Sequence, residues 1–121
     1  MESQQLMQRI VTTLDQHKAS DIQVIGVTQV TTITDYFVIA EGNSSTQVKA
    51  LTDYVEDALS KEEITPFRKE GYHSSTWILM DYGSVIVHVF QRDTRQYYDL
   101  ERLWKDGEQV DISVILDCEE K

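Results

Sequence analysis

The segment from Trp77 to Phe90 constrains the fold more than any other part of the chain. Two runs of β-branched and aromatic residues flank Gly83 and Ser84, which is the pattern of a β-hairpin with a two-residue turn. Such a turn fixes which residues share a face, because side chains alternate along each strand. One face then collects Trp77, Leu79, Asp81, Ile86, His88 and Phe90, and the other collects Ile78, Met80, Tyr82, Val85, Val87 and Val89.

The second of these faces is almost entirely apolar and is the natural core face. The first face combines large apolar side chains with Asp81 and His88. Tryptophan is a favoured anchor in protein interfaces, where charges at the rim set the orientation of the partner. This face is therefore either a surface kept for a partner or ordinary core covered by another element, and the pattern leaves both interpretations open.

The rest of the chain shows helical and extended patterns in turn. Leu6, Ile10 and Leu14 at four-residue steps predict an amphipathic helix, and Pro66 favours an edge position or a strand start. The expected elements are a helix near 2–18, strands over 21–27 and 35–41, a helix from Ser44 or Ser45 to about Lys61, a short strand over 64–69, the hairpin, and a helix over 92–104. This order predicts one α/β domain over 1–104, with a mixed sheet of about five strands and helices packed on it. In the tail, 105–121, the run VDISVIL is a candidate for an added strand.

The predicted last helix is unusually rich in large rings. Tyr97, Tyr98 and Trp104 lie on it together with Leu100 and Leu103. One helix of a small domain rarely needs so many large rings for its core alone, which favours a second contact surface. Amphipathic packing with the tyrosine hydroxyls turned to water is the alternative.

The charge of the chain restricts its partners. Lys and Arg number 11 and Asp and Glu number 21, which gives a net charge of −10. Such a surface repels phosphate backbones, and the only dense basic cluster is Arg68 and Lys69. We therefore expect no direct, specific binding to nucleic acid, and an acidic surface suits a basic partner. The alternative is that the charge only aids solubility.

The chain shows no pattern of a secreted or membrane protein. Cys118 is the single cysteine, so no intramolecular disulfide is expected. The N-terminal residues lack a signal-peptide pattern, and no apolar run approaches the length of a membrane span. A cytoplasmic protein is the expectation.

A catalytic site is weakly supported. The turn Gly42-Asn43-Ser44-Ser45 precedes a helix and could hold an anion, and it vaguely resembles the glycine-serine turn of nucleotidyltransferases. Those enzymes need paired carboxylates for magnesium, whereas the following strand offers only Glu70, next to Arg68 and Lys69. A divergent nucleotide-binding enzyme is kept as the alternative function, and an N-capped helix is the simpler interpretation of the turn.

Other catalytic patterns are also missing from the sequence. The three histidines, His17, His73 and His88, lack the spacing of metal ligands. Asp81 and His88 could act as a base and its helper, but no nucleophile is evident. We expect no catalytic residue, metal or cofactor.

Two stretches, DYFVIAEGNSSTQV and KEGYHSSTWILMDYGSVIVHVFQRDTRQYYDLERLW, resemble the signature segments of the Iojap, or ribosomal silencing factor, family. The resemblance covers roughly Leu6 to Trp104. Its most specific residues are Glu70-Gly71, Trp77, Asp81-Tyr82-Gly83, His88 and the Tyr98-x-Leu100-Glu101-x-x-Trp104 end. The tail after Trp104 departs from the shorter members.

The resemblance implies a mixed sheet akin to that of nucleotidyltransferases, without their catalytic carboxylates. It implies a protein that binds the large ribosomal subunit through the fourteenth of its ribosomal proteins, on the face that meets the small subunit. Such binding blocks subunit joining and lowers translation when nutrients are scarce, and family members tend to form homodimers. By position, the contact residues implied here are Trp77, Leu79, Met80, Asp81, Tyr82, His88, Tyr98, Leu100 and Trp104. Strand alternation places Met80 and Tyr82 opposite Trp77, which favours a core position for both.

Overall fold

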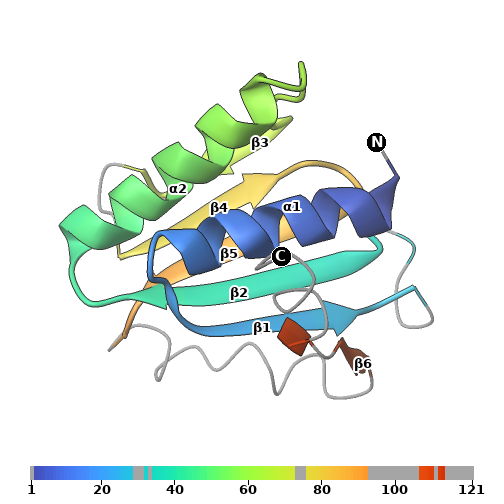
Figure 1. The fold of residues 1–121 in the computed structure, drawn as a ribbon, viewed down its shortest axis with the longest axis horizontal. Coiled ribbons are helices and arrows are strands. Elements are labelled where there is room, and N and C mark those ends of the chain that lie inside the picture. The colour runs from blue at the N-terminus through green and yellow to red at the C-terminus, as the bar shows by residue number, and fades with distance from the viewer. Residues whose placement is uncertain are drawn as a thin grey trace.

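The computed structural model describes residues 2–28, 32, 34–72, 76–92, 107–110 and 112–113 (Figure 1). In chain order the elements are α1 (Ser3–Gln16), β1 (Ser20–Gly26), β2 (Tyr36–Gly42), α2 (Ser45–Ser60), β3 (Arg68–Glu70), β4 (Trp77–Asp81), β5 (Val85–Gln91) and β6 (Glu108–Val110). Six of these elements are strands of one sheet, in the order β3-β4-β5-β2-β1-β6.

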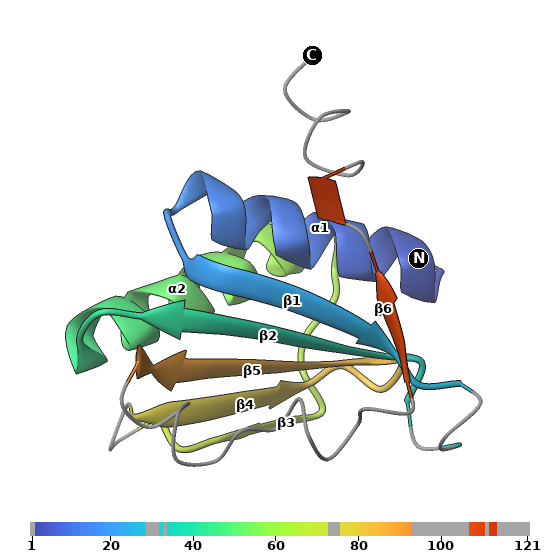
Figure 2. The same ribbon diagram turned by 90° about the horizontal axis from the view of Figure 1, so that it is seen from below.

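The sheet is mixed, as predicted. β2 pairs with β5 in parallel, and every other pairing between its strands is antiparallel. Both helices lie side by side on one face of the sheet (Figures 1 and 2). We call this the helix face and the opposite one the rear face. In the described part of the chain, the architecture is therefore a layer formed by α1 and α2 on a layer of strands.

The helices form where the apolar stripes predict them. Leu6, Ile10 and Leu14 of α1 are all buried. In α2, the side chain of Ser44 accepts a hydrogen bond from the backbone N–H of Gln47 at 3.1 Å. Ser44 is thus the N-cap, because its hydroxyl satisfies one of the free amides of the first turn.

The core is divided by the sheet into two clusters. The cluster on the helix face contains the stripes of both helices and alternate residues of the strands, including Val38, Val87 and Met80. The cluster on the rear face consists of Ile25, Val27, Phe37, Ile39, Ile86 and Phe90. Strand alternation thus gives the central strands buried side chains on both faces.

The hairpin has the predicted register. Trp77 pairs with Phe90 and Leu79 with His88. The turn is tight because the backbone N–H of Tyr82 donates to the carbonyl oxygen of Val85 at 2.9 Å. Gly83 has a φ of 87°, a left-handed conformation that glycine adopts without steric cost.

The strands predicted over 21–27 and 35–41 are each displaced by one residue in the structure, and two other predicted strands differ by more than one residue. β3 begins at Arg68 rather than at 64, because Pro66 has no amide to donate and the first hydrogen bond to β4 comes from Phe67. The predicted edge position of this strand is confirmed. The added strand of the tail is Glu108–Val110, antiparallel to β1, so it shares only Val110 with the predicted run. Of the predicted last helix, 92–104, residues 93–104 lie outside the described part of the chain.

Candidate partner-binding surface

The candidate surface lies on the rear face, where β4 and β5 run side by side. Trp77 and Leu79 of β4 are half-buried and pack against the rear cluster. Their partners across the strands are Phe90 and His88, which are buried. The alternation of β4 therefore aims a tryptophan and a leucine away from the helices, as the hairpin pattern predicts.

Four rings form an aromatic cluster on this face: Phe37, Trp77, His88 and Phe90. The centroids of Trp77 and Phe90 are 5.2 Å apart with ring planes 20° from parallel, and those of Phe37 and His88 are 5.3 Å apart. Ring pairs at these separations add to the stabilisation from burial alone. Phe37 was not among the predicted contact residues, and it is buried in β2.

His88 is the polar member of the aromatic cluster. The Nε1–H of Trp77 donates a hydrogen bond to its Nδ1 at 3.1 Å. Burial lowers the pKa of His88 to about 4, so the ring is neutral at pH 7. Within the described part of the chain, its Nε2 is buried without a hydrogen-bond partner.

Asp81 places a carboxylate at the end of β4, beside the turn. Its Oδ1 accepts a hydrogen bond from the backbone N–H of Gly83 at 2.8 Å, and its Oδ2 lies 4.0 Å from Nη2 of Arg68. The side chain is 25% exposed. A negative charge is thereby fixed next to the half-buried apolar residues of the same strand.

Met80 and Tyr82 lie on the helix face. Met80 is fully buried and Tyr82 is 5% exposed, and both belong to the cluster that packs under the helices. Burial raises the pKa of the Tyr82 hydroxyl. The core position favoured by strand alternation is thus confirmed, while a direct partner contact by either residue stays a prediction. Tyr98, Leu100 and Trp104, together with Tyr97 and Leu103, lie outside the described residues.

The turn before α2 is organised as a helix cap. Besides the Ser44 bond, the backbone N–H of Asn43 donates to Oε1 of Gln47 at 2.6 Å. Over the described ranges, no three His, Cys, Asp or Glu side chains come close enough together to hold a metal ion. None of the helices in those ranges has the length and apolar character needed to cross a membrane.

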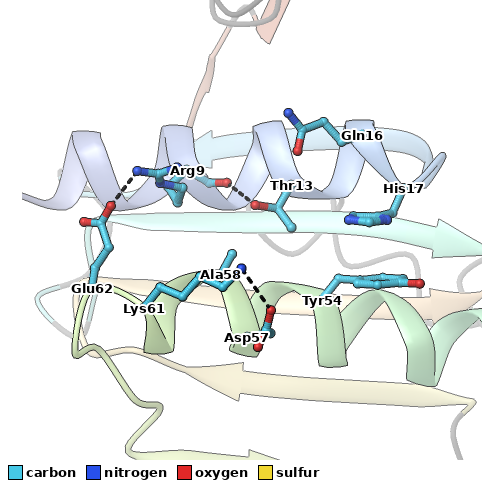
Figure 3. Close-up of a pocket in the computed structure, with 9 residues that line it drawn as sticks. All are labelled: Arg9, Thr13, Gln16, His17, Tyr54, Asp57, Ala58, Lys61 and Glu62. Carbon is cyan, nitrogen blue, oxygen red and sulfur yellow. Dashed lines mark hydrogen bonds and ion pairs between the residues drawn. The ribbon is translucent and has the colours of Figure 1, made fainter.

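A groove lies between α1 and α2, on the far side of the helices from the sheet (Figure 3). It is a polar groove with a cavity volume of about 390 Å³. The rings of His17 and Tyr54 stack in it at 3.6 Å, and Arg9 forms an ion pair with Glu62. Sequence reasoning missed this groove, because its residues come from helices far apart in the chain and no spacing connects them.

Comparison with known protein families gives a match over the whole chain. A family model described as "Ribosomal silencing factor during starvation" matches residues 1–121. The ribosomal silencing factor RsfS of Halalkalibacterium halodurans is 36% identical over 116 residues, which cover 96% of this chain and 99% of that protein. The family match includes the predicted last helix and the tail.

Another relative and a solved structure agree with this match. The mouse protein named "Mitochondrial assembly of ribosomal large subunit protein 1" is 37% identical over 98 residues, covering 78% of this chain and 43% of that protein. A crystal structure from Chromobacterium violaceum superposes with a TM-score of 0.84 at 34% identity, covering 87% of this chain and 88% of that one. This similarity confirms the predicted mixed α/β fold.

Proposed function

Since this chain belongs to the ribosomal silencing factor family, we propose that it binds the large ribosomal subunit and prevents the small subunit from joining. Translation then falls when nutrients are limiting. The family's description, which refers to starvation, supports the second step. The name of the mouse relative, which refers to the large subunit, supports the choice of subunit.

We propose that the partner is the fourteenth ribosomal protein of the large subunit, at the intersubunit face. The observation that carries this proposal is the half-buried pair Trp77 and Leu79 beside the carboxylate of Asp81. An apolar anchor with a charge at its edge is the usual composition of a protein–protein contact. Family resemblance adds His88, Tyr98, Leu100 and Trp104 to this surface.

Met80 and Tyr82 have a supporting role in this proposal. Both are buried under the helices, so they hold β4 in place from behind while Trp77 and Leu79 face the partner. Residues that pack behind an interface keep its side chains in the binding geometry.

The charge of the chain supports a protein target within an RNA-rich particle. A net charge of −10 attracts a basic ribosomal protein and repels the phosphates of the surrounding ribosomal RNA. The protein acts by occupying a surface, and no catalytic step is required. It acts in the cytoplasm, where the subunits are.

Co-sedimentation with purified subunits tests the proposal. We expect the protein to pellet with large subunits and not with small ones, at low and at moderate salt. Addition of the protein to mixed subunits should also reduce the peak of joined ribosomes in a sucrose gradient. Equal pelleting with both subunits, or unchanged joining at a saturating concentration, would contradict the proposal. Binding of ATP with magnesium in calorimetry would instead favour the enzymatic alternative.

Trp77→Ala removes the ring that we propose as the central contact with the partner. We expect it to weaken binding to the large subunit by roughly 1–3 kcal/mol, because a central ring in an interface contributes on this scale. Tyr98→Ala is expected to fall in the same range. Tyr54→Ala is the matched control, since Tyr54 is 47% exposed and belongs to α2 on the opposite side of the sheet. Wild-type affinity in the folded Trp77 variant would contradict the assigned surface.

We also propose that the protein forms homodimers, as the family resemblance implies. Sedimentation velocity over a range of concentrations measures this directly. A single monomeric species at tens of micromolar would contradict it.

A further inference from the structure

One hydrogen bond connects the two nitrogen-containing rings of the aromatic cluster. The indole Nε1–H of Trp77 donates to the imidazole Nδ1 of His88 at 3.1 Å. Trp77 pairs with Phe90, and His88 pairs with Leu79, so the bond runs diagonally between neighbouring strands. His88 is 4% exposed, whereas Trp77 is half-buried. The bond therefore connects the more exposed ring to a buried acceptor.

The position of the His88 ring and the nitrogen that carries its proton are both determined. An indole N–H can only donate, so Nδ1 of His88 carries a lone pair and the proton is on Nε2. The imidazole packs near the rings of Phe37 and Phe90, with centroid separations of 5.3 Å and 6.1 Å. These contacts leave the imidazole little freedom to rotate.

We propose that His88 is a positioning residue, whose Nδ1 holds the indole of Trp77 in the orientation that the ribosomal partner meets. This inference rests on the proposed function. Without an acceptor, the indole can rotate about its second side-chain torsion to bring its N–H to water. The ring then offers a different edge to the partner. A ring held before binding loses less freedom on binding, which strengthens association.

Two substitutions at one position separate the acceptor from the bulk of the ring. His88→Leu removes the hydrogen-bond acceptor and places an apolar side chain in the buried position. His88→Asn retains an oxygen that is as many bonds from the backbone as Nδ1. In co-sedimentation with large subunits, we expect His88→Leu to bind about tenfold more weakly and His88→Asn to stay within about threefold of wild type. His17→Leu, at the end of α1, is the matched histidine control and should bind as wild type.

A double-mutant cycle tests whether His88 acts through Trp77. Trp77→Phe keeps an aromatic ring but has no N–H to donate. In that background, His88→Leu should cause less than about a twofold further loss, because the interaction that it removes is already absent.

The indole N–H resonance reports the orientation without reference to binding. In protein with ¹⁵N-labelled tryptophan, the Trp77 signal is identified by its loss in Trp77→Phe. We expect the signal to be preserved in His88→Asn. In His88→Leu the Trp77 signal should shift, and the indole N–H of Trp77 should exchange faster with water. A merely structural role of His88 would leave the exchange rate of this N–H unchanged.

The possible results decide the inference. Wild-type binding by a folded His88→Leu variant would overturn it, as would equal losses in both His88 variants with an unchanged indole resonance. If His88→Leu does not fold, the wild-type indole N–H decides: slow exchange with water supports a bond to His88 in solution, and exchange as fast as that of an exposed indole overturns the inference. If the wild-type protein binds neither subunit, the proposed function fails, and the role of His88 in partner binding fails with it. The indole resonance still shows whether His88 holds the ring of Trp77.

Discussion

At the residue scale, His88 makes folding sensitive to pH. Burial lowers its pKa from 6.5 to about 4, so between these values the unfolded chain binds a proton that the folded chain does not. Folding stability therefore rises with pH through this window and is lost as the pH falls from about 6.5 to about 4. The free energy of unfolding lost over the whole window is on the order of 3 kcal/mol, from the difference between the two pKa values.

Urea unfolding at pH 7 and pH 5 measures this effect. We expect the free energy of unfolding of the wild type to be lower at pH 5, and His88→Asn to lose less between the two values, because it has no imidazole to titrate. Carboxylates contribute equally in both proteins, so the difference between the two proteins isolates His88. Parallel pH dependence in both would show that His88 does not resist protonation in the folded state.

At the element scale, the start of β4 depends on the glycine that follows β3. Gly71 has a φ of 83°, and a Cβ added there would collide with the carbonyl oxygen of Trp77. The backbone at the start of β4 therefore has its position only because residue 71 has no side chain. Gly26, at the end of β1, has no such restriction: its nearest neighbours would lie 3.6 Å or more from an added Cβ.

Alanine should be far more destabilising at Gly71 than at Gly26. We expect Gly71→Ala to destabilise the protein by about 2 kcal/mol or more and to weaken large-subunit binding, since Trp77 moves with its backbone. Gly26→Ala should change the free energy of unfolding by less than about 1 kcal/mol, because the added methyl group makes ordinary contacts. Denaturant unfolding and co-sedimentation of both variants check this. Equal stability of the two variants would contradict the role of Gly71.

At the scale of the whole molecule, the net charge of −10 should govern how fast the proposed partner is found. Opposite charges accelerate encounter, and salt screens this attraction. The effect is cleanest with the isolated ribosomal protein, because ribosomal RNA is then absent.

With that isolated protein we expect the association rate constant to fall by about tenfold from low to moderate salt, while the dissociation rate constant changes much less. Stopped-flow or surface-based kinetics give both constants in one experiment. An association rate that does not depend on salt would show that charge does not steer the encounter.

The sequence by itself determined the features that depend on neighbouring residues. The two-residue turn at Gly83 and Ser84 fixed the register of the hairpin and the two faces of β4. Ser44 and Ser45 located the start of α2 to within one residue, and Ser44 is the N-cap. Periodicity, turn length and capping are local, so they can be recognised without knowing where other elements lie. The face on which Trp77 lies could be predicted for the same reason, while its contact with a partner stays a prediction.

The tertiary structure alone decided which distant elements meet. The parallel pairing of β2 with β5, the docking of β6 on β1 and the groove between the helices join segments with no common pattern. The bond from Trp77 to His88 required the register and also the rotamers of both rings. These features depend on the packing of the whole core, because each side chain takes the orientation that its non-local neighbours leave open.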